Sequence, residues 1–240
     1  MLLAGRAEVW FTDRFGLAGE PVLDERVTDP YDRFNVATHV GDDHVRVEAR
    51  RRSLPGAPAV FMDQVHGAHI ETLAHAPDGP VPSADGLVTG LPGLTLAVLV
   101  ADCLPVLIYE PQLEVVAAVH AGRRGIELDV LAHAVAAVSS LGGDPARVAV
   151  AIGPSIGPCC YEVPAQMRDE LAAIVPAAAA VTRWGTPSID LRAAAVAQLA
   201  AAGVHTVDVS PVCTYESSRH YSFRRDAVTG RFAGLIRLPA

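Results

Sequence analysis

Hydrophobic residues in this chain form short continuous runs that alternate with longer stretches of helical periodicity. Residues 94–100 (Leu-Thr-Leu-Ala-Val-Leu-Val) are a continuous apolar run, which predicts a central strand buried on both faces. Shorter apolar runs predict further strands at residues 113–119, 148–152 and 206–209. The runs are bounded by Gly, Pro, Ser or charged residues, as is typical of strand ends.

Apolar residues recur at helical spacing between these strands. The periodicity predicts helices over residues 126–141, 165–175 and 190–202, with Gly203 ending the last one. The apolar face of the first predicted helix comprises Ile126, Leu128, Leu131, Val135, Val138 and Leu141. Strand and helix signals that alternate in this way predict a layered α/β fold.

Composition indicates one folded domain over residues 1–240. Half of the residues are hydrophobic and 19% are charged, and neither a low-complexity linker nor a repeat divides the chain. No apolar stretch is long enough to span a membrane without interruption, and the first residues lack a signal-peptide pattern, so we expect a cytoplasmic protein without a membrane partner. The net charge of −8 argues against a nucleic-acid partner. Four cysteines are too few for a disulfide scaffold, and the oligomeric state is not predicted.

Three predicted strands end in residues that can carry chemistry. These ends are Ala101-Asp102-Cys103, His120-Ala121-Gly122 and Gly153-Pro154-Ser155. Ligands of α/β proteins collect at the carboxyl ends of strands, so we expect a site where these ends converge. Arg123 and Arg124 follow Gly122 at a predicted helix start, where backbone N–H groups can bind an anion. A plain strand-to-helix turn with two solvated arginines explains the same segment equally well.

One thiol and two imidazoles form a candidate metal site. Cys103 and His120, together with His66 in Met-Asp-Gln-Val-His-Gly, suit zinc and would leave a fourth coordination position open. The three residues are far apart in the sequence and form no local ligand motif. Packing or capping roles for these side chains therefore remain open at this stage.

Ordered motifs along nearly the whole chain carry a family resemblance. They are Phe11–Arg14, Phe34–Asp43, Gln64–Gly67, Ala84–Gly86, Ala101–Val106, His120–Gly122, Ile152–Ile156, Cys160–Val163 and Ser222–Asp226. With these motifs the chain resembles the laccase-domain family once described as multicopper polyphenol oxidoreductases and now associated with zinc-dependent purine nucleoside phosphorylase activity. The resemblance implies a single-domain α/β sandwich with mixed β-sheets and a metal in a surface cleft.

The resemblance also implies roles for individual residues. It implies that His66, Cys103 and His120 bind Zn²⁺, and that Arg51, Ser222 and Arg224 help to hold phosphate or nucleoside. Two positions depart from the family pattern. Arg123 stands where the family commonly has tryptophan, and Arg50 replaces the asparagine of an Asn-Arg pair. The first departure removes a planar surface near the metal, and the second adds either an anion contact or a surface charge.

The implied reaction is phosphorolysis of adenosine, inosine or methylthioadenosine, with adenosine deaminase side activity. Phosphate must be held close to the anomeric carbon, and arginine binds phosphate oxygens in a bidentate way that lysine cannot copy. Arg51, Arg124 and Arg224 are the candidates, assisted by backbone N–H groups near Gly122. Asp102 would orient a ligand histidine or act as acid/base, with a turn cap as the alternative.

Two other activities compete with this interpretation. The older family name suggests a copper polyphenol oxidase, but multi-centre copper sites typically use H-x-H pairs, and the sequence contains none. Copper(II) would nevertheless bind one Cys and two His in vitro. A cysteine hydrolase with Cys103 as nucleophile and His120 as base would suit the editing of a misincorporated amino acid in UDP-MurNAc peptidoglycan precursors, a task also linked to the family. A non-catalytic partner protein has little support.

The remaining histidine and cysteine candidates are not predicted to bind a metal. His69 lies three positions from His66, so on a strand it would face the opposite way. Cys159 and Cys160 are adjacent and would be strained in sharing one tetrahedral ion. Cys213 at a strand end is predicted to be a core residue.

Overall fold

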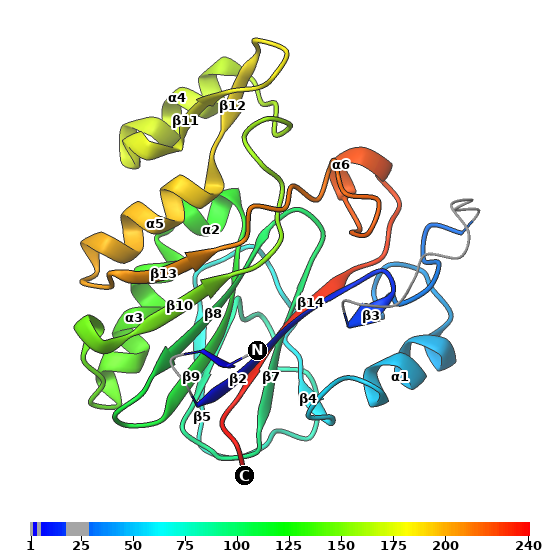
Figure 1. The fold of residues 1–240 in the computed structure, drawn as a ribbon, viewed down its shortest axis with the longest axis vertical. Helices are drawn as coiled ribbons and strands as arrows, with labels where there is room; N and C mark the ends of the chain where they lie inside the picture. Colours follow the sequence, from blue (N-terminus) through cyan, green and yellow to red (C-terminus); the bar gives the residue numbers. More distant parts are fainter. Residues whose placement is uncertain (1, 4–5, 18–28) are drawn as a thin grey trace.

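Two mixed β-sheets packed face to face form the centre of the molecule (Figure 1). The computed structural model describes residues 2–3, 6–17 and 29–240. The first sheet has the order β1 (Leu2–Leu3), β2 (Ala7–Asp13), β14 (Phe232–Arg237), β7 (Thr95–Val100) and β4 (Ala59–Val60), with β3 (Gly16–Leu17) paired to β2. The second sheet has the order β13 (Thr206–Val209), β10 (Ala149–Ile152), β8 (Leu104–Glu110), β9 (Val115–Ala121), β6 (Gly86–Thr89) and β5 (Ile70–Leu73).

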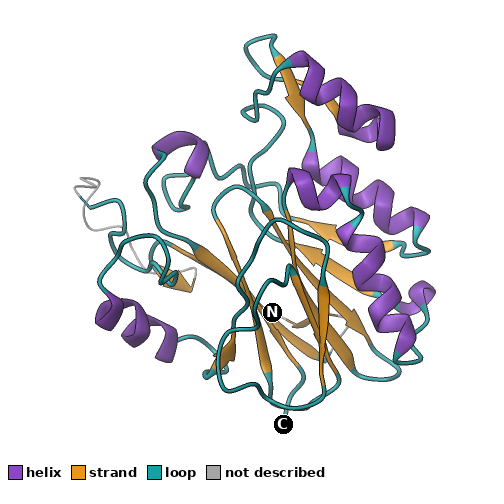
Figure 2. Cartoon of the chain, turned by 180° about the vertical axis from the view of Figure 1, so that it is seen from behind, coloured by secondary structure: helices purple, strands orange, loops and turns teal. Residues whose placement is uncertain are grey.

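Helices cover the outer face of the second sheet (Figure 2). This layer contains α2 (Arg123–Glu127), α3 (Val130–Ser140) and α5 (Leu191–Ala201). On the side of the first sheet, α1 (His44–Arg52) lies beside β4. The other elements are α4 (Ala165–Ile174), which packs with the small sheet β11 (Ala179–Val181) and β12 (Pro187–Ile189), the 3₁₀ turns Pro145–Arg147 and Pro176–Ala178, and the short helix α6 (Phe223–Asp226). The predicted layered α/β sandwich with mixed sheets is confirmed.

Strand periodicity divides the core into layers. Along β9, Val115, Ala117 and Val119 join the core between the second sheet and the helices, whereas Val116 and Ala118 join the core between the two sheets. Alternate residues of a strand share a face, so His120 continues the series that points between the sheets. The side chains of β7 are also buried on both faces, as its apolar run predicts. The candidate histidine thus lies at one end of the inter-sheet core.

Most predicted elements are confirmed within one or two residues, and two differ instructively. The single helix predicted over 126–141 is wrong, because α2 ends at Glu127 and Asp129 adopts a left-handed φ of 57° before α3 begins. Ile126 and Leu131 are five positions apart, and a continuous helix would not place them on one face. The break between α2 and α3 allows both side chains to pack into the same core. The strand predicted at 113–119 runs instead from Val115 to Ala121, because Leu113 lies exposed in the turn after β8. Among the described residues, no helix has the length and apolar character needed to cross a membrane.

A buried histidine makes the stability of the fold sensitive to acid. His220 is 8% exposed, its Nδ1 lies 2.8 Å from the hydroxyl of Ser217, and its ring contacts Phe232 edge-on. Burial lowers the pKa of His220 to about 4. Between pH 6.5 and 4 the unfolded chain therefore binds a proton that the folded chain does not, so stability from this residue is lost as the pH falls.

We expect this effect to amount to roughly 2–3 kcal/mol in the free energy of unfolding between pH 7 and pH 4. Urea unfolding of the wild type and of His220→Gln at both pH values measures it, because the variant lacks the titrating group. His133→Gln is the matched control, since His133 is exposed on α3. An equally steep loss of stability in His220→Gln and in the wild type would contradict the assignment.

Candidate metal centre and cavity

A cavity of about 620 Å³ lies at the end of the inter-sheet core. Its volume is in the range of about 300–1,000 Å³ that is typical of small-molecule sites. Its walls come from the loop after β4, the β7–β8 junction, the end of β9, the start of α6 and the residue that precedes β14. The lining includes His66, Asp102, Cys103, His120 and Arg224, so five of the sequence candidates converge here.

The three predicted metal ligands meet in this cavity. The candidate ligand atoms of His66, Cys103 and His120 all lie within 4.8 Å of one another. His66 Nε2 is 4.0 Å from Cys103 Sγ, and the two imidazole rings stand edge-to-face with their centroids 4.7 Å apart. One thiolate and two imidazoles at this spacing can hold a transition-metal ion and leave one position open to a ligand. The donor set therefore agrees with a metal centre.

Gly122 lets the chain pass close to this group. A Cβ at position 122 would lie 2.9 Å from Cys103 Sγ and 3.2 Å from His66 Cδ2. Any other residue would push the thiol or the imidazole away from its present place. The glycine of the His-Ala-Gly motif thus serves the packing of the candidate ligands and also begins α2.

Asp85 organises both candidate ligand histidines. Its buried carboxylate accepts a hydrogen bond from His120 Nδ1 at 2.8 Å and from the backbone N–H groups of Val65, His66 and Gly67. The bond at Nδ1 leaves Nε2 of His120 as the ring nitrogen available to a metal, an arrangement common among metal-binding histidines. Burial alone would raise the pKa of Asp85, but the bonds from His120 and the backbone hold it below its ordinary value.

Sequence analysis named Asp85 only as part of a motif. The carboxylate is 35 positions from His120 in the sequence. Only the antiparallel pairing of β6 with β9 brings the two residues together. The presence of an acidic residue within an Ala-Asp-Gly turn was the only available signal.

The charges of the cluster favour the thiolate of Cys103 and the protonated form of His120. Burial alone would raise the pKa of the Cys103 thiol, but the neighbouring His120 and His66 lower it to about 6. The thiolate and Asp85 in turn raise the pKa of His120 to about 9, against the effect of burial. These shifts favour a negative charge on Cys103 and a proton on His120. A metal cation would replace the proton of His120 in this arrangement.

Asp102 connects the cavity to α6. One of its carboxylate oxygens accepts the hydroxyl of Thr214 and the other accepts the backbone N–H of Arg224, both at 2.6 Å. Its backbone is left-handed, with a φ of 93°. The orienting position beside a candidate ligand histidine belongs to Asp85. The acid/base role of Asp102 stays a prediction.

Two arginine–aromatic pairs stand at the cavity. The guanidinium of Arg224 lies 4.9 Å from the ring centre of Tyr161, and that of Arg231 lies 5.8 Å from the ring centre of Phe223. All four residues line the cavity. The motif around Arg224 predicts this arginine as a site residue. Arg231, Tyr161 and Phe223 are not predictable as site residues, because only the tertiary fold places them together.

The other predicted phosphate contacts lie outside this lining. Arg51 donates from Nε to the carbonyl of Val36 at 2.8 Å and packs over the ring of Phe61. Arg124 is exposed on α2. Ser222 is buried and caps α6 by accepting the N–H of Arg225.

Both departures from the family pattern have local partners. Arg123 pairs with Glu127 one helical turn away on α2. Arg50 donates to the carboxylate of Asp42 at 2.9 Å and therefore has an intramolecular partner for its charge. Neither residue lines the cavity.

Comparison with known proteins assigns the chain to a family. The family model described as multi-copper polyphenol oxidoreductase laccase matches residues 23–239. The chain belongs to this family. Among curated relatives of this laccase family, one from Streptomyces coelicolor, named purine nucleoside phosphorylase SCO2081, is 48% identical over 96% of this chain and 95% of its own length. Another, from Shigella flexneri and named purine nucleoside phosphorylase YfiH, is 37% identical over 86% of this chain and 87% of its own.

Solved structures of similar proteins share the fold. YlmD from Geobacillus stearothermophilus superposes with a TM-score of 0.85 at 33% identity, covering 98% of this chain and 92% of that one. The Neisseria meningitidis protein NMB0706 superposes with a TM-score of 0.83 at 30% identity, covering 98% and 95%. The α/β sandwich of this laccase-family chain is therefore a known architecture.

Proposed function

We propose that this chain is a zinc-dependent purine nucleoside phosphorylase. It would cleave adenosine, inosine and methylthioadenosine with phosphate to the free base and ribose 1-phosphate or methylthioribose 1-phosphate. The observation that carries the proposal is one cavity in which a His-Cys-His group faces two arginine–aromatic pairs. The names of the curated relatives support the same activity.

His66, Cys103 and His120 would hold the zinc. Bound there, it would supply a Lewis acid or lower the pKa of a water ligand. Asp85 keeps His120 in the tautomer and orientation that metal binding requires. Water activation would also account for adenosine deaminase side activity, which we include in the proposal. Copper(II) would occupy the same donors in vitro.

The remaining cavity residues would bind and orient the substrates. Arg224 and Arg231 bring positive charge to the lining, and guanidinium groups bind phosphate oxygens in a bidentate way. Tyr161 and Phe223 offer aromatic faces on which a purine can stack. They would replace the planar surface that Arg123 removes. Asp102 is the candidate to move a proton to the departing base.

Arg224→Lys is expected to raise the KM for phosphate about tenfold, because an ammonium lacks the planar two-pronged donor of a guanidinium. The kcat at saturating phosphate should change less. Steady-state kinetics with varied phosphate and saturating adenosine measure both values. Arg168→Lys on α4 is the control, since Arg168 pairs with Asp169 away from the cavity. An unchanged KM for phosphate in Arg224→Lys would remove Arg224 from the phosphate site.

The activity itself is tested by incubating the protein with adenosine, with and without phosphate, and separating the products by chromatography. Adenine that forms only with phosphate supports the phosphorylase. Inosine that forms regardless of phosphate would identify a deaminase instead. No product under either condition would contradict both.

A cysteine hydrolase is the second candidate, and one observation favours it. The lowered pKa of Cys103 beside His120 is also what a nucleophilic thiolate requires. A thiolate bound to zinc is poorly available for attack, so alkylation of Cys103 by iodoacetamide separates the two. Protection of Cys103 by added zinc supports the metal centre, and rapid alkylation of Cys103 in the zinc-loaded protein would favour the hydrolase.

A further inference from the structure

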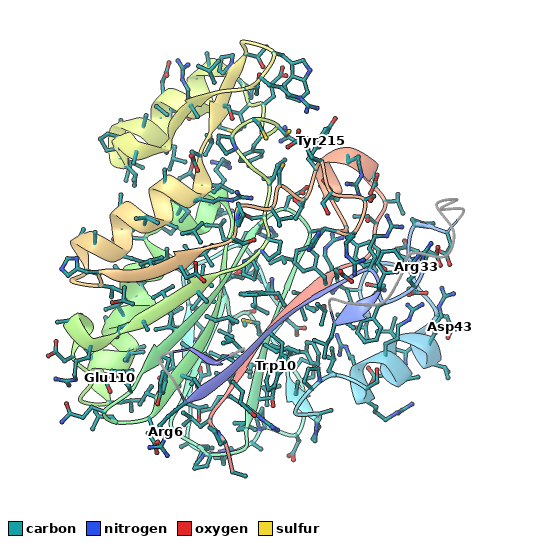
Figure 3. All side chains as sticks on the ribbon, viewed as in Figure 1. Arg6, Trp10, Arg33, Asp43, Glu110 and Tyr215 are labelled. Atoms are coloured by element: carbon teal, nitrogen blue, oxygen red, sulfur yellow. The ribbon has the colours of Figure 1, made fainter. Side chains whose placement is uncertain are left out.

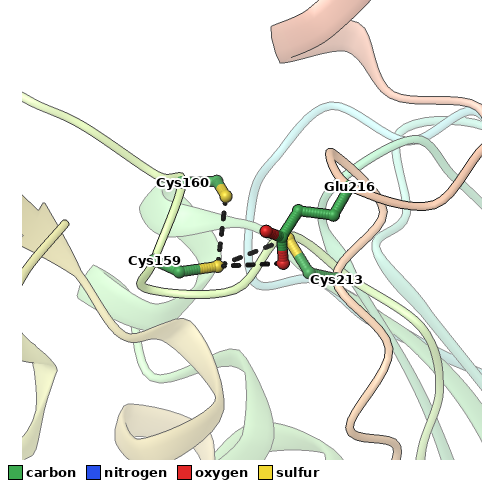
Figure 4. Close-up of side chains that lie close together, drawn as sticks. All are labelled: Cys159, Cys160, Cys213 and Glu216. Atoms are coloured by element: carbon green, nitrogen blue, oxygen red, sulfur yellow. Dashed lines mark hydrogen bonds between the residues drawn. The ribbon is translucent and has the colours of Figure 1, made fainter. Parts of the chain in front are cut away.

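A second group of metal-ligating side chains lies outside the cavity (Figure 4). Cys159 and Cys160 occupy a turn that precedes α4, and Cys213 and Glu216 belong to the loop after β13. The candidate ligand atoms of all four lie within 4.8 Å of one another. Sequence analysis assigned these cysteines separate structural roles. The fold instead brings residues more than fifty positions apart into one cluster, and the turn lets two adjacent thiols approach each other.

The separations approach those of a tetrahedral zinc site. Cys159 Sγ is 3.7 Å from Cys213 Sγ and 3.6 Å from a carboxylate oxygen of Glu216. Zinc–sulfur bonds of about 2.3 Å at tetrahedral angles place two sulfurs about 3.8 Å apart. The sulfurs of Cys159 and Cys160 are closer, at 3.1 Å. They would have to separate by roughly 0.7 Å to reach the tetrahedral value.

The backbone around the sulfurs is shaped for them. The N–H of Gly157 donates to Cys213 Sγ at 3.2 Å, which favours negative charge on that sulfur. A Cβ at position 157 would lie 3.2 Å from Cys159 Sγ and 3.5 Å from Cys213 Sγ. A glycine here thus allows the chain to wrap closely around both sulfurs.

A cation would allow the buried thiols of this cluster to ionise together. Cys160 and Cys213 are 2% and 9% exposed, whereas Glu216 is exposed and could admit an ion from solvent. Burial, reinforced by Cys160 and Cys213, raises the pKa of Cys159. Burial also raises the pKa of Cys160, reinforced by Cys213 and opposed by the hydrogen bond with Cys159. Several thiols packed this closely cannot all ionise unless a cation compensates them.

We propose that Cys159, Cys160, Cys213 and Glu216 form a second metal site, for a thiophilic divalent ion such as Zn²⁺. The site is separate from the group formed by His66, Cys103 and His120. Its donors are mostly sulfur, which is typical of structural zinc.

The ion would connect two loops that build the cavity. Tyr161, which follows Cys160, lines the cavity, and Thr214, which follows Cys213, donates its hydroxyl to Asp102. Without an ion, hydrogen bonds and packing alone join these loops at the cluster. A bound ion would therefore hold Tyr161 and Asp102 in fixed relation. This role does not depend on which reaction the cavity performs.

Cys103→Ser provides a sharp test, because the chain has four cysteines and the other three belong to this cluster. The reduced, metal-free variant is titrated with Co²⁺ and then with Zn²⁺. We expect one Co²⁺ per chain with sulfur-to-cobalt charge-transfer absorption in the near ultraviolet, displaced by one equivalent of Zn²⁺. Adding Cys213→Ser to this variant should weaken cobalt binding at least tenfold.

Glu216→Gln, also in the Cys103→Ser background, keeps the test decisive if the Cys213 variant does not fold. We expect weaker cobalt binding with an unchanged circular dichroism spectrum. Glu170→Gln on α4 is the matched control, and its cobalt binding should be unchanged. Two results would overturn the proposal. One is the absence of a one-to-one cobalt complex with thiolate absorption, and the other is a cobalt complex that neither Cys213→Ser nor Glu216→Gln affects.

Discussion

Replacing His120 with alanine is expected to lower kcat/KM for phosphate-dependent cleavage of adenosine by roughly 1,000-fold, equal to about 4 kcal/mol. The change removes one of three candidate ligands and leaves the buried Asp85 carboxylate without its imidazole partner. Zinc bound per chain should fall by one equivalent in the same preparation. Steady-state kinetics and elemental analysis measure the two quantities.

His69→Ala is the matched control for this variant. His69 lies three residues from His66 but is exposed and pairs with Glu71, outside the cavity. Its replacement should change neither the zinc content nor kcat/KM. Equal losses in both variants, or full activity in His120→Ala, would contradict the metal centre.

Asp85→Asn is expected to weaken zinc binding about 10–100-fold, the range typical of lost partners behind metal ligands. Asparagine keeps the size of aspartate, but its amide nitrogen cannot accept hydrogen bonds. At least one of the N–H groups that now donate a hydrogen bond to Asp85 would lose its acceptor. Competition with a chelator measures the affinity. Excess zinc should restore much of the lost activity, because the three ligands remain.

Glu110→Gln is the matched control, because it replaces another buried carboxylate by an amide at a position away from the cavity. Glu110 ends β8 and pairs with Arg147, and Figure 3 shows it far from Tyr215 and α6. We expect some loss of stability in this variant and an unchanged zinc affinity. Unchanged zinc affinity in Asp85→Asn would show that Asp85 does not support the metal centre.

The fold was predictable where burial alone determines the pattern. The apolar run of β7 predicts a strand that is buried on both faces. This prediction does not depend on knowing which elements pack against the strand. The break at Asp129 was not predicted, because the apolar positions of α2 and α3 have nearly the spacing of one continuous helix. The five-residue step from Ile126 to Leu131 is the one irregularity that marks the break. Helix packing against the sheet, rather than local propensity, decides that break.

The candidate site was predictable only in part. The side-chain types of His66, Cys103 and His120 made them candidates, the family resemblance implied that they bind Zn²⁺, and the fold does place them in one cluster. Asp85 could not be distinguished from other acidic residues, because its role depends on strand pairing 35 positions away.

Arginine was a weaker signal than the metal ligands. Its side chain serves in bonds to carbonyls outside the cavity, as Arg51 does, and in the cavity lining, where Arg231 also donates to carbonyls. Sequence position cannot separate these two uses, because both depend on which distant backbone or ring the guanidinium meets in the folded chain.

In the proposed reaction, the protein transfers the ribosyl group of a purine nucleoside to phosphate in the cavity. Phosphorus-31 NMR of a reaction with adenosine and limiting phosphate tests it most directly, with adenine quantified by chromatography in the same sample. We expect one ribose 1-phosphate for each adenine formed, and neither product with His120→Ala. Adenine without ribose 1-phosphate, or turnover that leaves phosphate unconsumed, would contradict it.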